Sequence, residues 1–362
     1  MLRLVPRAEK SHVMVYITPL LTVALTLVAG AIMFMLLGHN PGTALYTFFI
    51  GPLTDKGVVS AYNIAELMVK ATPLVLIAIG LALGFRANVW NIGAEGQLTL
   101  GAIAGGGLAL ALYPSESPLL MPAMFAVAIL GGAAWAAIPA YLKTHFNCNE
   151  ILTSLMLTYI AILLLAYLIH GPLKDPEGYN FPESRQFQDA ATMPIIWAGT
   201  RLHLGWIFAL GAVALGWILV NRHLIGFQIR VIGQAPHAAK FAGFSERKII
   251  WFVLLVSGGL AGLAGTFEVT GPIGQIVPTI SPGYGFTAII VAFLGRLHPV
   301  GILFAGLLMA LTYLGGETAQ IELNLPNAVT GVFQGMILFF LLACDVFVNY
   351  RIKFTAARIG KA

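Results

Sequence analysis

The amino-acid sequence predicts an all-α integral membrane protein with about ten transmembrane helices, one or two of them broken or re-entrant, and both termini in the cytoplasm. Of the 362 residues, 58% are hydrophobic and 10% are charged, whereas charged residues make up about a quarter of a soluble domain. Many stretches between charges approach the roughly 20 residues that a helix needs to cross a bilayer. The loops between these stretches differ in their content of Lys and Arg, which is how orientation is encoded.

Ten apolar segments follow one another along the chain. The first lies within the 26 uncharged residues from Val13 to Gly38, too long for the apolar core of a signal peptide and long enough for an anchor. The eighth is short and follows Pro278, Pro282 and Gly283, so we expect a half-span or re-entrant helix there. The segments cover residues 14–38, 62–85, 92–113, 119–141, 151–170, 204–220, 249–268, 284–296, 299–316 and 328–348.

Basic residues predict the orientation. With a cytoplasmic N-terminus and ten crossings, fifteen of the twenty Lys and Arg residues fall on the cytoplasmic side. This excess follows the positive-inside rule. An odd number of crossings would place the basic C-terminal tail outside, so we expect an even number and two cytoplasmic termini.

We expect a single transmembrane domain over residues 1–362, with an extracytoplasmic cap loop at 171–203 and a cytoplasmic loop at 221–248. The cap loop mixes charges with four prolines, which is typical of an ordered cover rather than a flexible linker. It is either a solvated cover or a docking surface for another protein. The candidate docking residues are Lys174, Asp175, Glu177, Glu183 and Arg185.

The loop at 221–248 carries five basic residues and one acidic residue, which favours the cytoplasmic side. Within it, residues 236–243 begin with proline and end with glycine, the pattern of a short helix. A short exposed helix of small residues is either an ordinary connector or a docking element for a partner.

Two polar, glycine-containing stretches interrupt the apolar segments. Polar side chains at membrane depth are costly unless they face protein or water, so each stretch is expected to line an interior surface, a gate or a pathway. The alternative for the first stretch is a tight glycine turn whose side chains satisfy backbone groups. The candidate pathway residues are Asn88, Asn91, Glu95 and Gln97 in the first stretch and Tyr284 and Phe286 in the second.

The sequence lacks the usual motifs of enzymes. It contains no phosphate-binding loop, no nucleophile elbow and no pair of histidines four residues apart. We therefore expect no catalytic residue, no metal, no cofactor and no nucleic-acid partner. Cys148 and Cys344 are expected to remain unpaired thiols.

Three strings carry a resemblance to a known family: Asn-Ile-Gly-Ala-Glu-Gly-Gln at 91–97, the loop at 226–243, and Ser-Pro-Gly-Tyr-Gly-Phe at 281–286 followed by 291–295. Over nearly its whole length the chain resembles the permease subunits of bacterial ABC importers of the branched-chain amino acid, ribose and nucleoside type. The strings at 148–160 and 171–176 resemble the nucleoside or simple-sugar branch.

This resemblance implies a non-enzymatic subunit in the bacterial cell (inner) membrane, surrounded by lipid. Its implied partners are ABC ATPase subunits, a second permease subunit in a heterodimer, and an extracytoplasmic solute-binding protein. The short helix at 236–243 is then the coupling helix seated on the ATPase, whose small residues admit the partner. The implied coupling residues are Pro236, Ala238, Ala239, Lys240, Ala242 and Gly243.

Gln234-Ala235 and Phe244 depart from the family pattern beside this helix. We expect a bulky residue at Ala239 to abolish transport while leaving membrane insertion intact. Amides and aromatic rings suit a neutral solute that forms hydrogen bonds, so a nucleoside or purine-type compound is the first candidate and a ribose-like sugar the second. An ion-coupled secondary transporter that uses Glu95, Glu268 or Glu317 is a further alternative.

Overall fold

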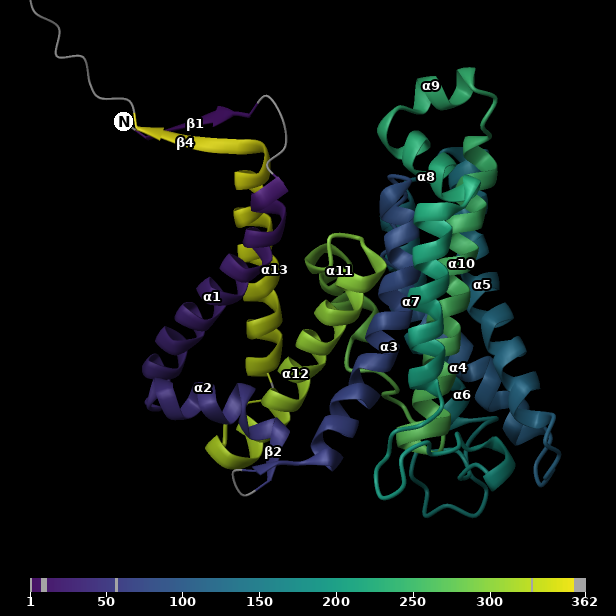
Figure 1. Ribbon diagram of the computed structural model, residues 1–362. Coiled ribbons are helices and arrows are strands. Elements are labelled where there is room, and N and C mark those ends of the chain that lie inside the picture. The colour runs from purple at the N-terminus through teal and green to yellow at the C-terminus, as the bar shows by residue number, and fades with distance from the viewer. Residues whose placement is uncertain (1, 8–11, 56–57, 327, 355–362) are drawn as a thin grey trace, which may run out of the picture. The chain divides into compact units, whose positions relative to one another are not determined.

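The structure is a computed structural model that describes residues 2–7, 12–55, 58–326 and 328–354. In this described part, eight helices are long and apolar enough to cross a membrane (Figure 1). Their spacing follows the sequence because charges and prolines lie mainly between them. They are α1 (His12–Leu36), α3 (Ala61–Arg86), α5 (Leu120–Phe146), α6 (Glu150–His170), α7 (Gly205–Arg222), α10 (Glu246–Glu268), α12 (Pro299–Leu323) and α13 (Ala328–Asn349).

Helices α4 (Ala94–Ala111) and α11 (Tyr284–Leu294) lie at the other two predicted segments. Helix α11 is too short to span a bilayer by itself, as the prolines and glycine before it predict. The remaining helical elements are α2 (Pro41–Phe49), α8 (Leu224–Gln234), α9 (Pro236–Phe241), the short 3₁₀ turns η1 (Gly51–Leu53) and η2 (Asp189–Ala191), and the π-helix η3 (Val269–Ile273).

The all-α expectation needs a correction at the two ends of the chain. Strand β1 (Leu2–Pro6) pairs antiparallel with β4 (Tyr350–Phe354), with Leu2 opposite Phe354. The start of α1 and the end of α13 lie together, so the chain beyond each helix satisfies its backbone groups by pairing with the other. Two further strands, β2 (Thr54–Asp55) and β3 (Val58–Val59), have two residues each.

The chain forms two compact units. Unit 1 comprises residues 1–57 and 312–362, and unit 2 comprises residues 58–311. An aromatic cluster holds unit 1 together: the ring of Phe333 stacks on Phe48 with centroids 4.3 Å apart and meets Phe34 at 5.5 Å. All three rings are fully buried, so they hold α2 against α1 and α13.

Unit 2 is built around α10, which packs against α3, α4 and α5. Glycines allow this close packing: a Cβ atom on Gly101 of α4 would lie 2.1 Å from the Cα of Gly262 in α10. Figure 1 shows α8 and α9 at one end of this bundle and the long loop after α6 at the other end. The two loops that the sequence assigns to opposite sides of the membrane therefore lie at opposite ends of unit 2.

The loop at 171–203 is hydrogen-bonded to another segment of unit 2. Its backbone N–H groups donate to the segment after α10, from Ser184 to the Ile276 carbonyl at 3.0 Å and from Phe187 to the Gly274 carbonyl at 2.9 Å. The Ser184 hydroxyl in turn accepts from the Ile276 N–H at 2.9 Å. These bonds satisfy backbone groups of a segment that has no regular secondary structure.

Candidate functional site

The short helix predicted in the loop at 221–248 is present as α9, and its ends have the expected chemistry. Pro236 occupies the first turn, where its missing N–H costs nothing. Gly243 has a φ of 79°, a backbone conformation that glycine adopts without strain. The Gly243 N–H donates to Lys240 and the Phe244 N–H donates to Ala239, which is the Schellman pattern of a helix end.

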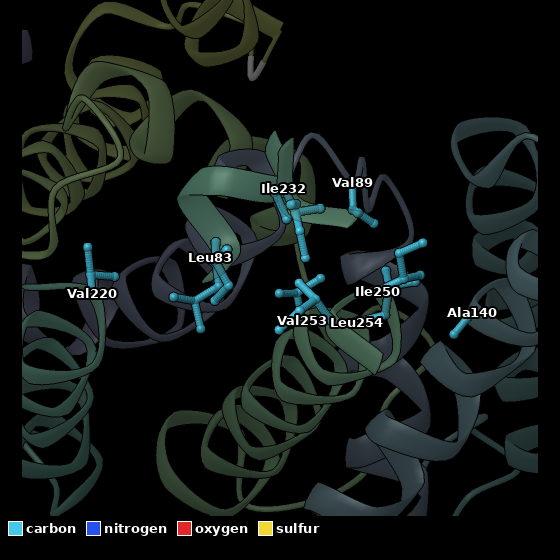
Figure 2. Close-up of a cluster of buried hydrophobic side chains, with 12 residues drawn as sticks. Leu83, Val89, Ala140, Val220, Ile232, Ile250, Val253 and Leu254 are labelled. Carbon is cyan, nitrogen blue, oxygen red and sulfur yellow. The ribbon is translucent and has the colours of Figure 1, made fainter. Parts of the chain in front are cut away.

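One face of α9 is buried against the rest of unit 2. Ala239 is 2% exposed and belongs to a buried apolar cluster with Ile232 of α8, Val89 after α3 and Ile250 of α10. Figure 2 shows how residues from these different elements gather in one cluster. The expectation that Ala239 admits a partner is therefore wrong: its small side chain seats α9 on the bundle.

The opposite face of α9 is open. Ala238, Lys240 and Ala242 are exposed, and Phe241 is 95% exposed although it is a large aromatic residue. Sequence reasoning missed Phe241 because nothing in the residue order shows which side of a six-residue helix faces outward. A cavity of about 450 Å³ lies beside this helix. Its lining residues are Ile232, Pro236, His237, Ala239, Lys240, Phe244, Ser245 and Glu246.

The two polar stretches meet at Glu95. Its carboxylate, 5% exposed, accepts a hydrogen bond of 2.6 Å from the Gly285 N–H in the first turn of α11, and the Ser281 side chain also hydrogen-bonds it. A Cβ atom on Gly285 would lie 2.3 Å from the Glu95 nitrogen, so only glycine permits the contact. Glu95 lies in the first turn of α4 and Gly285 in the first turn of α11, so this side chain links the N-termini of the two helices.

Asn91 and Gln97 form a second buried group beside this junction. Each is 1% exposed. The Asn91 amide donates to Gln97 Oε1 at 2.8 Å and to Ser257 Oγ at 3.0 Å, and the Gln97 amide donates back to Asn91 Oδ1 at 3.0 Å. The pair ties the segment between α3 and α4 to the middle of α10.

The candidate pathway residues therefore divide into two classes. Asn91, Glu95, Gln97 and the 1% exposed Tyr284 are enclosed by protein in this conformation. Asn88 is exposed and accepts from Trp90 Nε1 at 3.3 Å, while Phe286 is 38% exposed. In the first stretch, Asn91, Glu95 and Gln97 have hydrogen-bond partners within the protein.

The five candidate docking residues of the cap loop gather in one cluster. Arg185 donates to Asp175 at 3.3 Å and to Glu177 at 2.9 Å, and the Asp175 N–H donates to the Glu183 carbonyl at 2.8 Å. Lys174 donates to the side chain of Asn180. Glu183 also accepts from Gln275 of the segment after α10, at 2.8 Å, so the cluster is fastened to the bundle.

An ion pair between the buried Glu66 and the exposed Arg201, which the sequence did not reveal, fastens the end of the cap loop to α3. Arg201 Nε donates to Glu66 Oε1 at 2.9 Å, and its Nη2 contacts the other carboxylate oxygen. The hydrogen bonds to Glu66, which is 6% exposed, raise the pKa of Arg201 above its ordinary value. The two residues lie 135 positions apart, so no local pattern connects them.

Residues 63–342 match the family model described as "branched-chain amino acid transport system / permease component". The chain belongs to that family. The match begins in α3 and ends in α13, so it includes parts of both units and every candidate site residue.

The permease is also similar to characterised relatives over almost its full length. It is 36% identical to a glucose ABC transporter permease protein of Haloferax volcanii, with 99% of this chain and 95% of the relative covered. It is 31% identical to a guanosine ABC transporter permease protein of Bacillus subtilis, with 97% of each chain covered. A nucleoside ABC transporter permease protein of Lactococcus lactis is 28% identical over 90% of each chain.

Proposed function

We propose that this permease is the membrane-spanning subunit of an ATP-driven importer, and that α9 is the helix through which an ATPase subunit drives it. The observation that carries the proposal is the geometry of α9, which has one face seated in the core of unit 2 and the other open, with Phe241 95% exposed. A nearly fully exposed aromatic side chain on a well-anchored helix is typical of a protein–protein interface. The family and the named relatives support an ABC transporter.

The proposed solute is neutral and rich in hydrogen-bonding groups. A nucleoside is the first candidate, supported by the guanosine and nucleoside relatives. A simple sugar is the second candidate, supported by the glucose relative at 36% identity.

We propose that a solute-binding protein docks on the cap loop and that a second permease subunit completes the pathway as a heterodimer. Asn88 and Phe286 are the pathway residues that this conformation exposes.

We further propose ten crossings with both termini in the cytoplasm of the bacterial cell (inner) membrane. Eight helices are long enough, and α4 and α11 with their flanking segments supply the other two. The pairing of β1 with β4 supports a common side for the two termini, which agrees with an even number of crossings. The excess of basic residues in the loop at 221–248 favours the cytoplasm for that side of unit 2.

The first experiment is affinity purification of the tagged permease from native membranes in mild detergent, followed by mass spectrometry of its stoichiometric partners. We expect an ATPase and a second permease. The complex is then reconstituted in liposomes with ATP inside, and uptake of labelled guanosine and glucose is measured with the solute-binding protein. Uptake that requires an ion gradient and survives ATP depletion would replace this proposal with a secondary transporter.

A set of variants tests α9 itself. Ala238→Trp and Ala242→Trp add bulk to the open face and are expected to reduce co-purified ATPase and uptake by about tenfold or more, because a misfitted interface loses several kcal/mol. Phe241→Ala removes the exposed aromatic anchor and should have a similar effect. Ala198→Trp, at an exposed alanine of the cap loop, is the control and should leave ATPase binding unchanged.

The variant Ala239→Trp has a different expected outcome, because its side chain would enter the buried cluster. It is expected to destabilise unit 2 and to lower the amount of folded protein. Normal ATPase binding in Ala238→Trp, Ala242→Trp and Phe241→Ala together would contradict the assignment of α9.

A further inference from the structure

The end of α3 holds the turn that follows α11. Arg86 is the last residue of α3, and its Nε and Nη2 atoms donate to the Leu297 carbonyl at 3.0 and 2.9 Å. In the turn, Arg296 and Leu297 have φ values of 56° and 55°, a conformation that costs a residue with a side chain roughly 1–2 kcal/mol. Strained backbone persists where the surrounding structure stabilises it. Here the two hydrogen bonds from the Arg86 guanidinium group stabilise the turn.

The other side of Arg86 touches the cytoplasmic loop. Gly233 of α8 lies so close that a Cβ atom there would be 2.0 Å from the Arg86 carbonyl oxygen. Ile232, the preceding residue, shares the buried cluster of Figure 2 with Val89 and with Ala239 of α9. A displacement of α9 and α8 therefore presses directly on the last turn of α3.

Aromatic rings strengthen the same connection to α11. Phe293, near the end of α11, stacks on Phe85 with centroids 5.0 Å apart and on Trp90 at 5.7 Å. The opposite end of α11 is bonded to Glu95 through Gly285. Helix α11 is thus an 11-residue rod that is fastened at one end to the last turn of α3 and at the other end to the junction of the two polar stretches.

We propose that Arg86 is a positioning residue that transmits motion of the α8–α9 loop to α11, and through α11 to Glu95 at the junction. The inference rests on the proposed function, because it is the ATPase that would move α9. Arg86 suits the role since its planar guanidinium group holds one carbonyl with two charge-assisted hydrogen bonds, which resist rotation better than one. The linkage runs through contacts within unit 2 alone.

The test compares Arg86→Gln and Arg86→Lys with Arg230→Gln in the reconstituted complex. Arg230 is an arginine of α8 close enough to Arg86 to affect it electrostatically, and it serves as the control for loss of a positive charge. The measured quantities are ATP hydrolysis and the amount of guanosine or glucose moved per ATP hydrolysed. A residue that only stabilises the fold would lower ATP hydrolysis and solute uptake together, through the amount of active complex, and would leave the solute moved per ATP hydrolysed unchanged.

We expect Arg86→Gln to keep ATP hydrolysis within about twofold of wild type and to lower the solute moved per ATP by about tenfold, since a hydrogen bond to a charged group is worth at least that factor. Arg86→Lys keeps the positive charge but not the planar guanidinium group, so its solute moved per ATP should lie between those of wild type and Arg86→Gln. Arg230→Gln should match wild type. An unchanged ratio in Arg86→Gln would overturn the inference. If Arg86→Gln does not assemble, a wild-type ratio in Arg86→Lys would overturn it.

A second readout does not depend on the solute. In a background without the native cysteines, Phe286→Cys on α11 is labelled with a water-soluble maleimide, with and without ATP and vanadate. We expect nucleotide-dependent labelling that disappears when Arg86→Gln is added, while ATPase binding persists. Nucleotide dependence that survives Arg86→Gln would contradict the linkage, whereas absence of ATPase binding by the wild-type chain would contradict the proposed function instead.

Discussion

Glu95 joins two helix N-termini through one carboxylate, so removing it should loosen both. In Glu95→Ala, the buried Gly285 N–H loses its 2.6 Å acceptor, and a buried donor left without a partner costs about 1–3 kcal/mol. We expect a lower thermal midpoint in detergent and a loss of uptake, with Glu95→Gln intermediate because one acceptor oxygen remains. Glu116→Ala, at an exposed carboxylate, should match wild type. A wild-type midpoint and uptake in Glu95→Ala would show that the junction contributes nothing.

His203 should make the stability of the permease depend on pH. It lies 3% exposed before α7, its Nδ1 accepts from the Gly205 N–H at 3.2 Å, and burial lowers the pKa of its imidazole to about 4. The unfolded chain, with an ordinary pKa near 6.5, binds the proton first as pH falls. The stability held by neutral His203 is therefore complete above about pH 6.5 and is lost as pH falls towards 4, a change on the order of 3 kcal/mol.

The measurement is the thermal midpoint in detergent between pH 4 and pH 7.5. Asn at position 203 offers an oxygen close to where Nδ1 lies but does not titrate, so His203→Asn should flatten the slope between pH 6.5 and 4 even if its absolute midpoint is lower. His170→Gln, at an exposed histidine, should keep the wild-type slope. Equal slopes in His203→Asn and wild type would disprove the assignment.

For individual residues, the sequence predicts which side chains are important, but it does not predict which partners they contact. Asn91, Glu95 and Gln97 are identifiable because polar groups are costly at membrane depth. Their partner Ser257 lies 166 residues beyond Asn91, in a helix whose apolar sequence gives no sign of it. Phe241 went unnoticed for a related reason. The packing of α9 on the rest of unit 2 decides which of its side chains are exposed, and it buries Ala239 rather than Phe241.

Among the helices, α4 provides a matched test of glycine packing. A side chain at Gly101 would meet the backbone of Gly262 in α10, whereas Gly107 on the same helix has nothing within 4 Å of a Cβ atom. Overpacking of this kind costs about 1–3 kcal/mol or more. We expect Gly101→Val to lower the thermal midpoint and the folded yield, and Gly107→Val to leave both near wild type. If the two substitutions had equal effects, helix propensity rather than contact with Gly262 would explain the lower thermal midpoint.

Element positions were largely predictable because the bilayer sets the length of an apolar helix and charges mark its ends. Each of the ten predicted segments contains a helix, although eight are of membrane length in the described structure. Helix α8 was missed because it follows α7 after His223 alone, with no proline or glycine to mark a new element. The short strands at the chain ends were missed because they form only through pairing between distant segments.

Across the whole molecule, sequence composition predicts a membrane protein and charge bias predicts its orientation, but neither shows which segments lie together. The pairing of β1 with β4 joins residues 2–6 to residues 350–354, and the cap loop is held by a carboxylate of α3 and by carbonyls after α10. Such long-range contacts depend on the packed fold rather than on local pattern. Orientation, in contrast, is testable at two positions of closely matched exposure.

Tyr179 in the cap loop is 94% exposed and Phe241 on α9 is 95% exposed, and these residues lie in loops at opposite ends of unit 2 (Figure 1). In a chain with Cys148→Ala and Cys344→Ala, expressed without partner subunits, single cysteines at these positions differ only in the side of the membrane they face. Spheroplasts treated with a membrane-impermeant maleimide should label Tyr179→Cys but not Phe241→Cys, and permeabilised cells should label both. Labelling of Phe241→Cys in intact spheroplasts would place α9 outside, where no ATPase could reach it, and would refute both the orientation and the coupling role.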